Sequence, residues 1–136
     1  MGYNAFSIQY RTGGAQVACE DLAQAIDFIM NHAEELQLST EDYSLWGGSA
    51  GARMAAYLGP YSTQGFIDAT HERPAAVIMG YTGHSEYTQN DPPTYVIIGE
   101  DDAIASPATM RRRVENLQAL GIDAVKFWEK YISSKN

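Results

Sequence analysis

The sequence predicts an α/β protein in which helices flank a mostly parallel sheet of five strands. Helical segments and one loop separate five apolar runs in the order strand, helix, strand, helix, strand, loop, strand, helix, strand. This alternation is typical of βαβ units. The third and fourth runs are almost wholly apolar, as strands are when helices cover both faces. The five runs lie at residues 5–10, 43–46, 75–81, 94–99 and 124–131.

Three helices are expected between these strands. Residues 19–38 place apolar side chains three and four apart on one stripe, with acidic residues toward the start. Residues 50–58 form a short alanine-rich helix, and Ser106-Pro107 supplies an N-cap and first-turn residue for the third helix. The polar stretch 82–93 lacks a helical period, so a short loop is expected there and not an inserted cap.

Size and composition indicate one globular domain over residues 1–136. The formal net charge of −8 argues against nucleic acid and against an anionic membrane surface as partners. One cysteine, Cys19, excludes an internal disulfide and gives no cluster of metal ligands. The chain has no apolar run of membrane-spanning length, and its first residues do not resemble a secretory signal. A cytoplasmic protein is therefore expected.

The most informative motif is Gly47-Gly48-Ser49-Ala50-Gly51, a Gly-x-Ser-x-Gly pattern between a strand and a helix. This context is typical of a nucleophile elbow, in which a sharp turn exposes a serine above the sheet. Ser49 is the candidate nucleophile, and the backbone N–H of Ala50 is a candidate oxyanion donor. We expect close packing of helix on strand to require glycine at 47 and at 51. The alternative is a glycine-rich turn with an incidental serine.

A cluster of acids, Glu100-Asp101-Asp102, follows the fourth apolar run, at the strand end where such sheets carry their sites. A triad with this kind of elbow takes its acid from that region. Asp102 is the first candidate and Asp101 the second, and an exposed acidic strand end is the alternative. A divalent-metal site is disfavoured, because consecutive residues of an extended chain point to opposite sides.

Together with Tyr10-Arg11-Thr12 and Glu20-Asp21-Leu22, these motifs resemble the α/β-hydrolase superfamily. The closest resemblance is to the bacterial esterase/lipase group with acetylesterase-like members, and it extends to about residue 130. It implies a truncated α/β-hydrolase fold with Gly47 and Gly48 in the elbow, Ser49 as nucleophile and Asp102 as triad acid. It further implies cleavage of small carboxylic esters through an acyl-enzyme, with no cofactor and no metal.

The chain departs from that family at both ends. Nothing resembling its His-Gly-Gly oxyanion loop precedes Met1, and no histidine follows Asp102. The histidines are His32 in the first helix, His71 in a loop, and His84 after the third strand. His84 is the candidate for contact with the substrate or Ser49. Without a general base a serine is a poor nucleophile, so weak or no turnover is expected from this chain.

One strand of the family sheet, between the strands matching 5–10 and 43–46, has no counterpart here. We expect residues 5–10 to move inward and pair with the elbow strand. The alternatives are a homodimer through the exposed sheet edge and completion by another chain.

Two further expectations concern the tryptophans and the arginines. Trp46 and Trp128 are core candidates, and the arginine triplet 111–113 is expected on a solvated helix face.

Two other functions remain open. A non-catalytic hydrolase-fold remnant or binding module would keep the elbow without turnover. A flavodoxin-like binder is disfavoured, because Thr12-Gly13-Gly14 is too short to cradle a phosphate.

Overall fold

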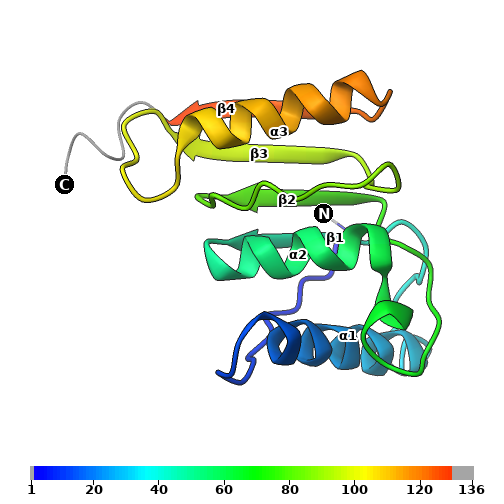
Figure 1. Cartoon of the computed structure of the whole chain (residues 1–136). Coiled ribbons are helices and arrows are strands. Elements are labelled where there is room, and N and C mark those ends of the chain that lie inside the picture. Colours follow the sequence, from blue (N-terminus) through cyan, green and yellow to red (C-terminus); the bar gives the residue numbers. More distant parts are fainter. Residues whose placement is uncertain (1, 130–136) are drawn as a thin grey trace.

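Four parallel strands make up the sheet of the computed structural model, which describes residues 2–129 (Figure 1). The strands lie side by side in chain order, and every neighbouring pair is parallel. Helices flank the sheet, which confirms the predicted α/β class with a parallel sheet. The strands are β1 (Ser44–Gly48), β2 (Ala76–Gly80), β3 (Thr94–Gly99) and β4 (Ala124–Glu129).

The number of strands in the prediction is wrong, because residues 5–10 form no strand. They have no regular structure, and among their side chains only Ile8 packs against the core. The alternating apolar pattern of this segment is local, whereas a strand exists only where a neighbour satisfies its backbone groups. Among residues 2–129, β1 is consequently an edge strand. The homodimer through this edge stays a prediction.

The helices occur where they were expected, with shifted ends. The first helix, α1 (Ala15–Asn31), begins earlier than the predicted start at residue 19 and ends earlier than the predicted end at residue 38. Turns occupy residues 32–37. The second, α2 (Ala50–Tyr61), continues through Pro60, and a short 3₁₀ helix, η1 (Thr63–Gly65), follows it. The third, α3 (Pro107–Ala119), begins at the predicted proline. None of the helices in residues 2–129 combines the length and the apolar character needed to cross a bilayer.

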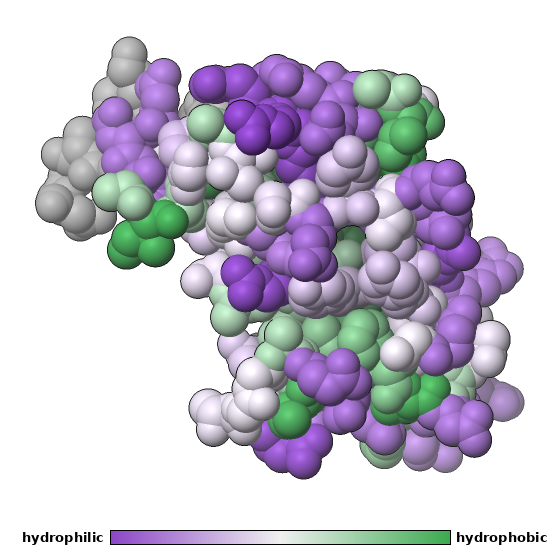
Figure 2. Space-filling view, in the orientation of Figure 1, coloured by the Kyte–Doolittle hydropathy of each residue, from purple (hydrophilic) through white to green (hydrophobic). Residues whose placement is uncertain are grey.

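The core lies on the face of the sheet that α2 and α3 cover (Figure 1). Both helices connect strands that advance in the same direction, and right-handed crossovers then place them on the same face. Alternate strand residues point into this layer and are buried. Apolar surface also gathers in the seam where α1 packs beside α2 (Figure 2). The largest fully buried core side chains include Leu58, Met79, Val96, Ile98, Met110 and Leu117.

The opposite face of the sheet carries an apolar row that the described residues leave open. Trp46, Ile78, Tyr95 and Val125 stand in register across β1, β2, β3 and β4. Trp46 is 74% exposed, so its prediction as a core residue is wrong. Its indole N–H donates to Ser44 Oγ at 2.8 Å, on the same strand and the same face. The apolar runs of β2 and β3 predicted helices on both faces of these strands. In the described residues helices cover one face, and the other face is open.

Candidate active site

Ser49 occupies the single-residue turn between β1 and α2, as the motif predicts. Its backbone has φ 53° and ψ −116°, a positive-φ conformation that side-chain-bearing residues adopt rarely. Hydrogen bonds fix the turn on both sides: the N–H of Ser49 donates to Gly80 O at 2.8 Å, and its carbonyl accepts from Ala52 N at 3.1 Å. The side chain caps no helix amide and is exposed. The turn therefore presents the Ser49 hydroxyl at the carboxyl end of β1.

The two outer glycines of the motif have different roles. A Cβ at Gly47 would lie 2.1 Å from the carbonyl oxygen of Gly51, so no side chain fits there. A Cβ at Gly51 would meet nothing within 4 Å, and the expectation that packing requires glycine at 51 is wrong. The reason is direction: the Cβ of Gly47 would point at the first turn of α2, whereas that of Gly51 would point away from its neighbours. Gly48 is also unconstrained, with its nearest neighbour at 4.0 Å.

Backbone amides at the start of α2 add a positive end to this site. Ala50 is the first residue of α2, and the first amides of a helix have no partner within the helix. Together with the helix dipole they favour negative charge at this end. Ser49 and Ala50 line the same hollow, so a developing oxyanion on a carbonyl bound at Ser49 has a donor in reach.

Asp102 is the acid that the structure fixes in place. It follows β3, and its Oδ1 accepts the N–H of Ile104 at 2.9 Å and of Ala105 at 2.8 Å. Both of those residues line the hollow that contains Ser49. Glu100 and Asp101 are exposed at the strand end. Within residues 2–129 no His, Cys, Asp and Glu side chains gather into a group that could hold a metal ion.

The hollow around Ser49 measures about 730 Å³ and is built from four segments. Residues 10–14 ahead of α1 form one wall with Ala15 and Ala18 of α1, and the first turns of α2 form another. Residues 81–83 after β2, with Ile104 and Ala105 after β3, close it, whereas Asp102 itself does not line it. Arg11, in the first wall, is held by Asp21 of α1 through an Nη2–Oδ1 contact of 2.7 Å. Of the residues 5–10 predicted as a strand, Tyr10 alone lines the hollow.

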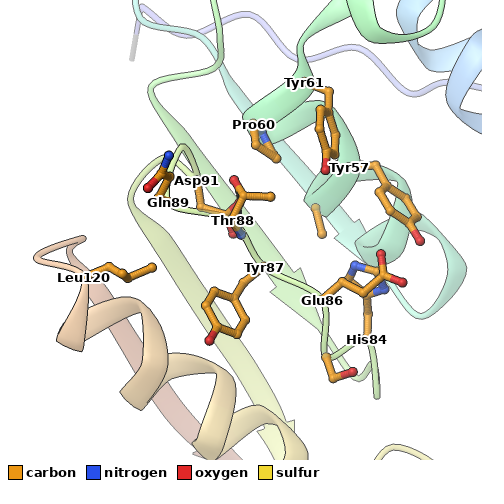
Figure 3. A pocket seen from close by; sticks show the side chains of 12 residues that line it. Tyr57, Pro60, Tyr61, His84, Glu86, Tyr87, Thr88, Gln89, Asp91 and Leu120 are labelled. Carbon is orange, nitrogen blue, oxygen red and sulfur yellow. Dashed lines mark hydrogen bonds between the residues drawn. The ribbon is translucent and has the colours of Figure 1, made fainter.

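His84 does not line the hollow of Ser49. It is 6% exposed, and its ring meets Tyr57 edge-on at 4.8 Å between centroids. It lines a second hollow of about 660 Å³ between α2 and the loop after β2, where Glu86 lies beside it (Figure 3). Burial, with the charges of Arg113 and Arg53, lowers the pKa of His84 to about 4. The imidazole is therefore neutral at neutral pH, but the structure does not bring it together with Ser49.

The other two histidines are engaged elsewhere. His71 Nε2 lies 2.7 Å from Asp27 Oδ1 and ties its loop to α1. His32 Nδ1 lies 2.7 Å from Phe28 O, and its ring stacks on that of Phe28. None of the three histidines, all of which fall within the described residues, lines the hollow of Ser49. The thiol of Cys19 is also unsuited to replace a missing base or nucleophile, because burial raises its pKa to about 11.

A buried ion pair that the sequence did not predict lies beside the second hollow. Arg113 Nη2 donates to Asp91 Oδ2 at 2.9 Å, and both side chains are 2% exposed. The expected solvated face therefore holds for Arg111 and Arg112 but is wrong for Arg113. Arg113 shares the buried stripe of α3 with Met110, Val114 and Leu117, and this spacing was a usable signal. Its Nε also donates to Glu86 O at 2.9 Å, so Arg113 anchors the loop after β2 at two points.

Comparison with known proteins bears on the family and the fold of this chain. The family model described as BD-FAE matches residues 1–79, which is more than half of the chain. No curated protein sequence matches the chain at a significant level.

Solved structures share the fold at low sequence identity. MGS-M1, an alpha/beta hydrolase enzyme from a Medee basin deep-sea metagenome library, has a TM-score of 0.67 and 21% identity, over 84% of this chain and 48% of that one. Thermogutta terrifontis esterase 2 in its apo form gives 0.72 and 19%, over 89% and 58%. A truncated carbohydrate esterase from gut microbiota gives 0.76 and 12%, over 90% and 64%.

The chain thus spans about half to two thirds of the length of these structures. The match of the family model and the shared sheet lead to one conclusion: this chain belongs to the BD-FAE family and has an α/β-hydrolase fold.

Proposed function

We propose that the protein is a serine hydrolase that cleaves small carboxylic esters, with Ser49 as the nucleophile. The observation that carries this proposal is the turn at Ser49, where a positive φ holds an exposed hydroxyl beside the free amide end of α2. In the reaction, Ser49 Oγ bonds to the acyl carbon while the ester bond to the alcohol breaks. Water then hydrolyses the acyl-enzyme, and the carboxylic acid leaves.

The roles of the remaining site residues follow from their positions. The Ala50 amide stabilises the oxyanion of the tetrahedral intermediate. Asp102 is the acid of the site, but none of the three histidines lines the hollow of Ser49. The hydroxyl proton must therefore pass to water or to a dissolved base. A serine without its general base keeps a small fraction of the full rate, so slow acylation and weak turnover are expected.

The direct test is covalent labelling with a fluorophosphonate probe, read by mass spectrometry of the labelled peptide. We expect slow labelling of the unmodified chain that approaches one probe per chain on long incubation, and none after Ser49→Ala. Ser85→Ala is a matched control, because Ser85 is exposed and lines the second hollow. Labelling that survives Ser49→Ala would refute the assignment of the nucleophile.

Adding imidazole sharpens this test. A dissolved imidazole can occupy the open hollow and act as the base that the described residues lack. Labelling of Ser49 should accelerate with imidazole concentration and follow the fraction of neutral imidazole as the pH changes. The Ser49→Ala chain gives the background at each concentration.

The second candidate is a non-catalytic member of the fold that keeps the hollow as a binding site. The placement of all three histidines outside the Ser49 hollow favours it. Under this alternative the probe would leave Ser49 unlabelled, with or without imidazole, in a chain that circular dichroism shows to be folded.

A further inference from the structure

Arg53 lies one helical turn after Ser49 on α2. The N–H of Arg53 donates to Ser49 O at 3.3 Å, and side chains four apart occupy the same face of a helix. Long side chains on a helix lean toward its N-terminus, which here is the end that carries Ser49. Arg53 is exposed and lines the same hollow as Ser49 and Ala50. A guanidinium therefore stands beside the position of the ester.

The two arginines that line the hollow of Ser49 differ in their ion pairs. Arg11 is occupied by Asp21, whose two carboxylate oxygens accept from its Nε and Nη2. Arg53 forms no ion pair with a carboxylate among the side chains that the structure describes. Asp102, the nearby acid of the site, directs its Oδ1 to backbone amides. Arg53 is thus a cation in the hollow with all its side-chain donors available.

The positive charge of Arg53 stands out in a chain that is acidic as a whole. The chain has a formal net charge of −8, so an anion approaching most of its surface is repelled. At this hollow the charge of Arg53 adds to the positive end of α2. A planar guanidinium offers two parallel donors that match the two oxygens of a carboxylate.

We propose that Arg53 binds a carboxylate carried by the ester substrate, so that the site selects esters with a second, anionic group. This rests on the proposed role of Ser49. The carboxylate can belong to the acyl part, as in a half-ester of a dicarboxylic acid, or to the alcohol part. In both cases it is the same contact with Arg53, made while the ester carbonyl lies at Ser49.

Matched nitrophenyl esters separate these sources. The pair for the acyl part is nitrophenyl hydrogen glutarate against nitrophenyl pentanoate. The pair for the alcohol part is nitrophenyl acetate with a ring carboxylate against nitrophenyl acetate. The quantity measured is the ratio of acylation rates within each pair, from the burst of nitrophenolate. For a charge-assisted contact in a solvated hollow we expect a ratio of about ten in one pair.

Variants of Arg53 test the origin of that ratio. Arg53→Gln should bring it close to one, and Arg53→Lys should retain part of it, because lysine keeps the charge without the paired donors. Arg112→Gln is the control for net charge, since Arg112 is exposed on α3 and lines neither hollow. The Arg112 variant should keep the full ratio. A ratio of one in the unmodified chain, or an unchanged ratio in Arg53→Gln, would overturn the proposal.

A binding measurement keeps the inference separate from catalysis. In the Ser49→Ala chain, monomethyl glutarate should shift the Nε–H resonance of Arg53 at millimolar concentration, while dimethyl glutarate should not. A shift without any acylation of Ser49 in the unmodified chain would support the carboxylate site and refute the proposed hydrolase. Acylation of Ser49 with a rate ratio of one, and with no shift of the Arg53 resonance, would support the proposed hydrolase and refute the carboxylate site.

Discussion

Replacing Ser49 with glycine is expected to make the fold more stable. At φ 53° and ψ −116° the Cβ of Ser49 is in a sparsely populated region, outside the left-handed helical well. Such a residue costs about 1–3 kcal/mol, a cost that glycine does not have. The more flexible unfolded chain of the glycine variant returns roughly 0.5–1 kcal/mol of this. The side chain makes no capping hydrogen bond that the substitution would remove.

The net gain is therefore about 1 kcal/mol, which corresponds to a rise in Tm of roughly 4 °C for a chain of this size. Urea denaturation followed by far-UV circular dichroism measures it, with an unchanged slope m as the sign of a two-state comparison. Ser49→Ala is the control, because alanine keeps the Cβ and with it the strain. If the glycine variant were no more stable than the alanine variant, the strain assigned to this turn would be refuted.

Further predictions concern the elbow, the buried pair and His84. Gly47→Ala should destabilise the fold by about 3 kcal/mol or more, since its Cβ meets backbone, whereas Gly51→Ala should stay within about 1 kcal/mol in the same urea assay. Arg113→Met should lower the free energy of unfolding by about 3–5 kcal/mol, because it leaves the buried carboxylate of Asp91 without its partner. The double variant with Asp91→Leu should regain most of that loss, and a negligible loss in Arg113→Met would refute the burial of the pair. Because His84 has a pKa of about 4 in the folded state against the ordinary histidine value of 6.5, the unfolded chain takes up the proton first as the pH falls. The free energy of unfolding should therefore decline from pH 6.5 to about 4, by at most about 3 kcal/mol, and His84→Gln should flatten this decline.

The sequence was sufficient for those parts of the fold that local pattern determines. The apolar runs located β2 and β3, and Gly-x-Ser-x-Gly located the junction of β1 and α2. Pro107 marked the first residue of α3. These features depend on residues adjacent in the chain, whose propensities and steric limits act before any tertiary contact forms.

The failures involve neighbours that are distant in sequence. Residues 5–10 alternate like a strand, but no local pattern states whether a partner strand lies beside them. Trp46 is apolar, yet its burial depends on a layer that would have to pack on that face of the sheet. Arg113 looked solvated beside two other arginines, because its partner Asp91 lies in a different segment. For the candidate site, the motifs named Ser49 and Asp102, whereas the separate hollow of His84 required the folded chain.

The open row on the sheet gives the protein a built-in optical reporter. Trp46 is largely in water, so its fluorescence should be red-shifted and readily quenched by acrylamide. Trp128→Phe would leave Trp46 as the remaining indole of the chain. Emission would then move to the blue, and quenching would fall, whenever a second layer came to cover Ile78, Tyr95 and their neighbours. A titration of the chain against itself, followed by this emission, would measure the affinity of a second copy for the open face of the sheet.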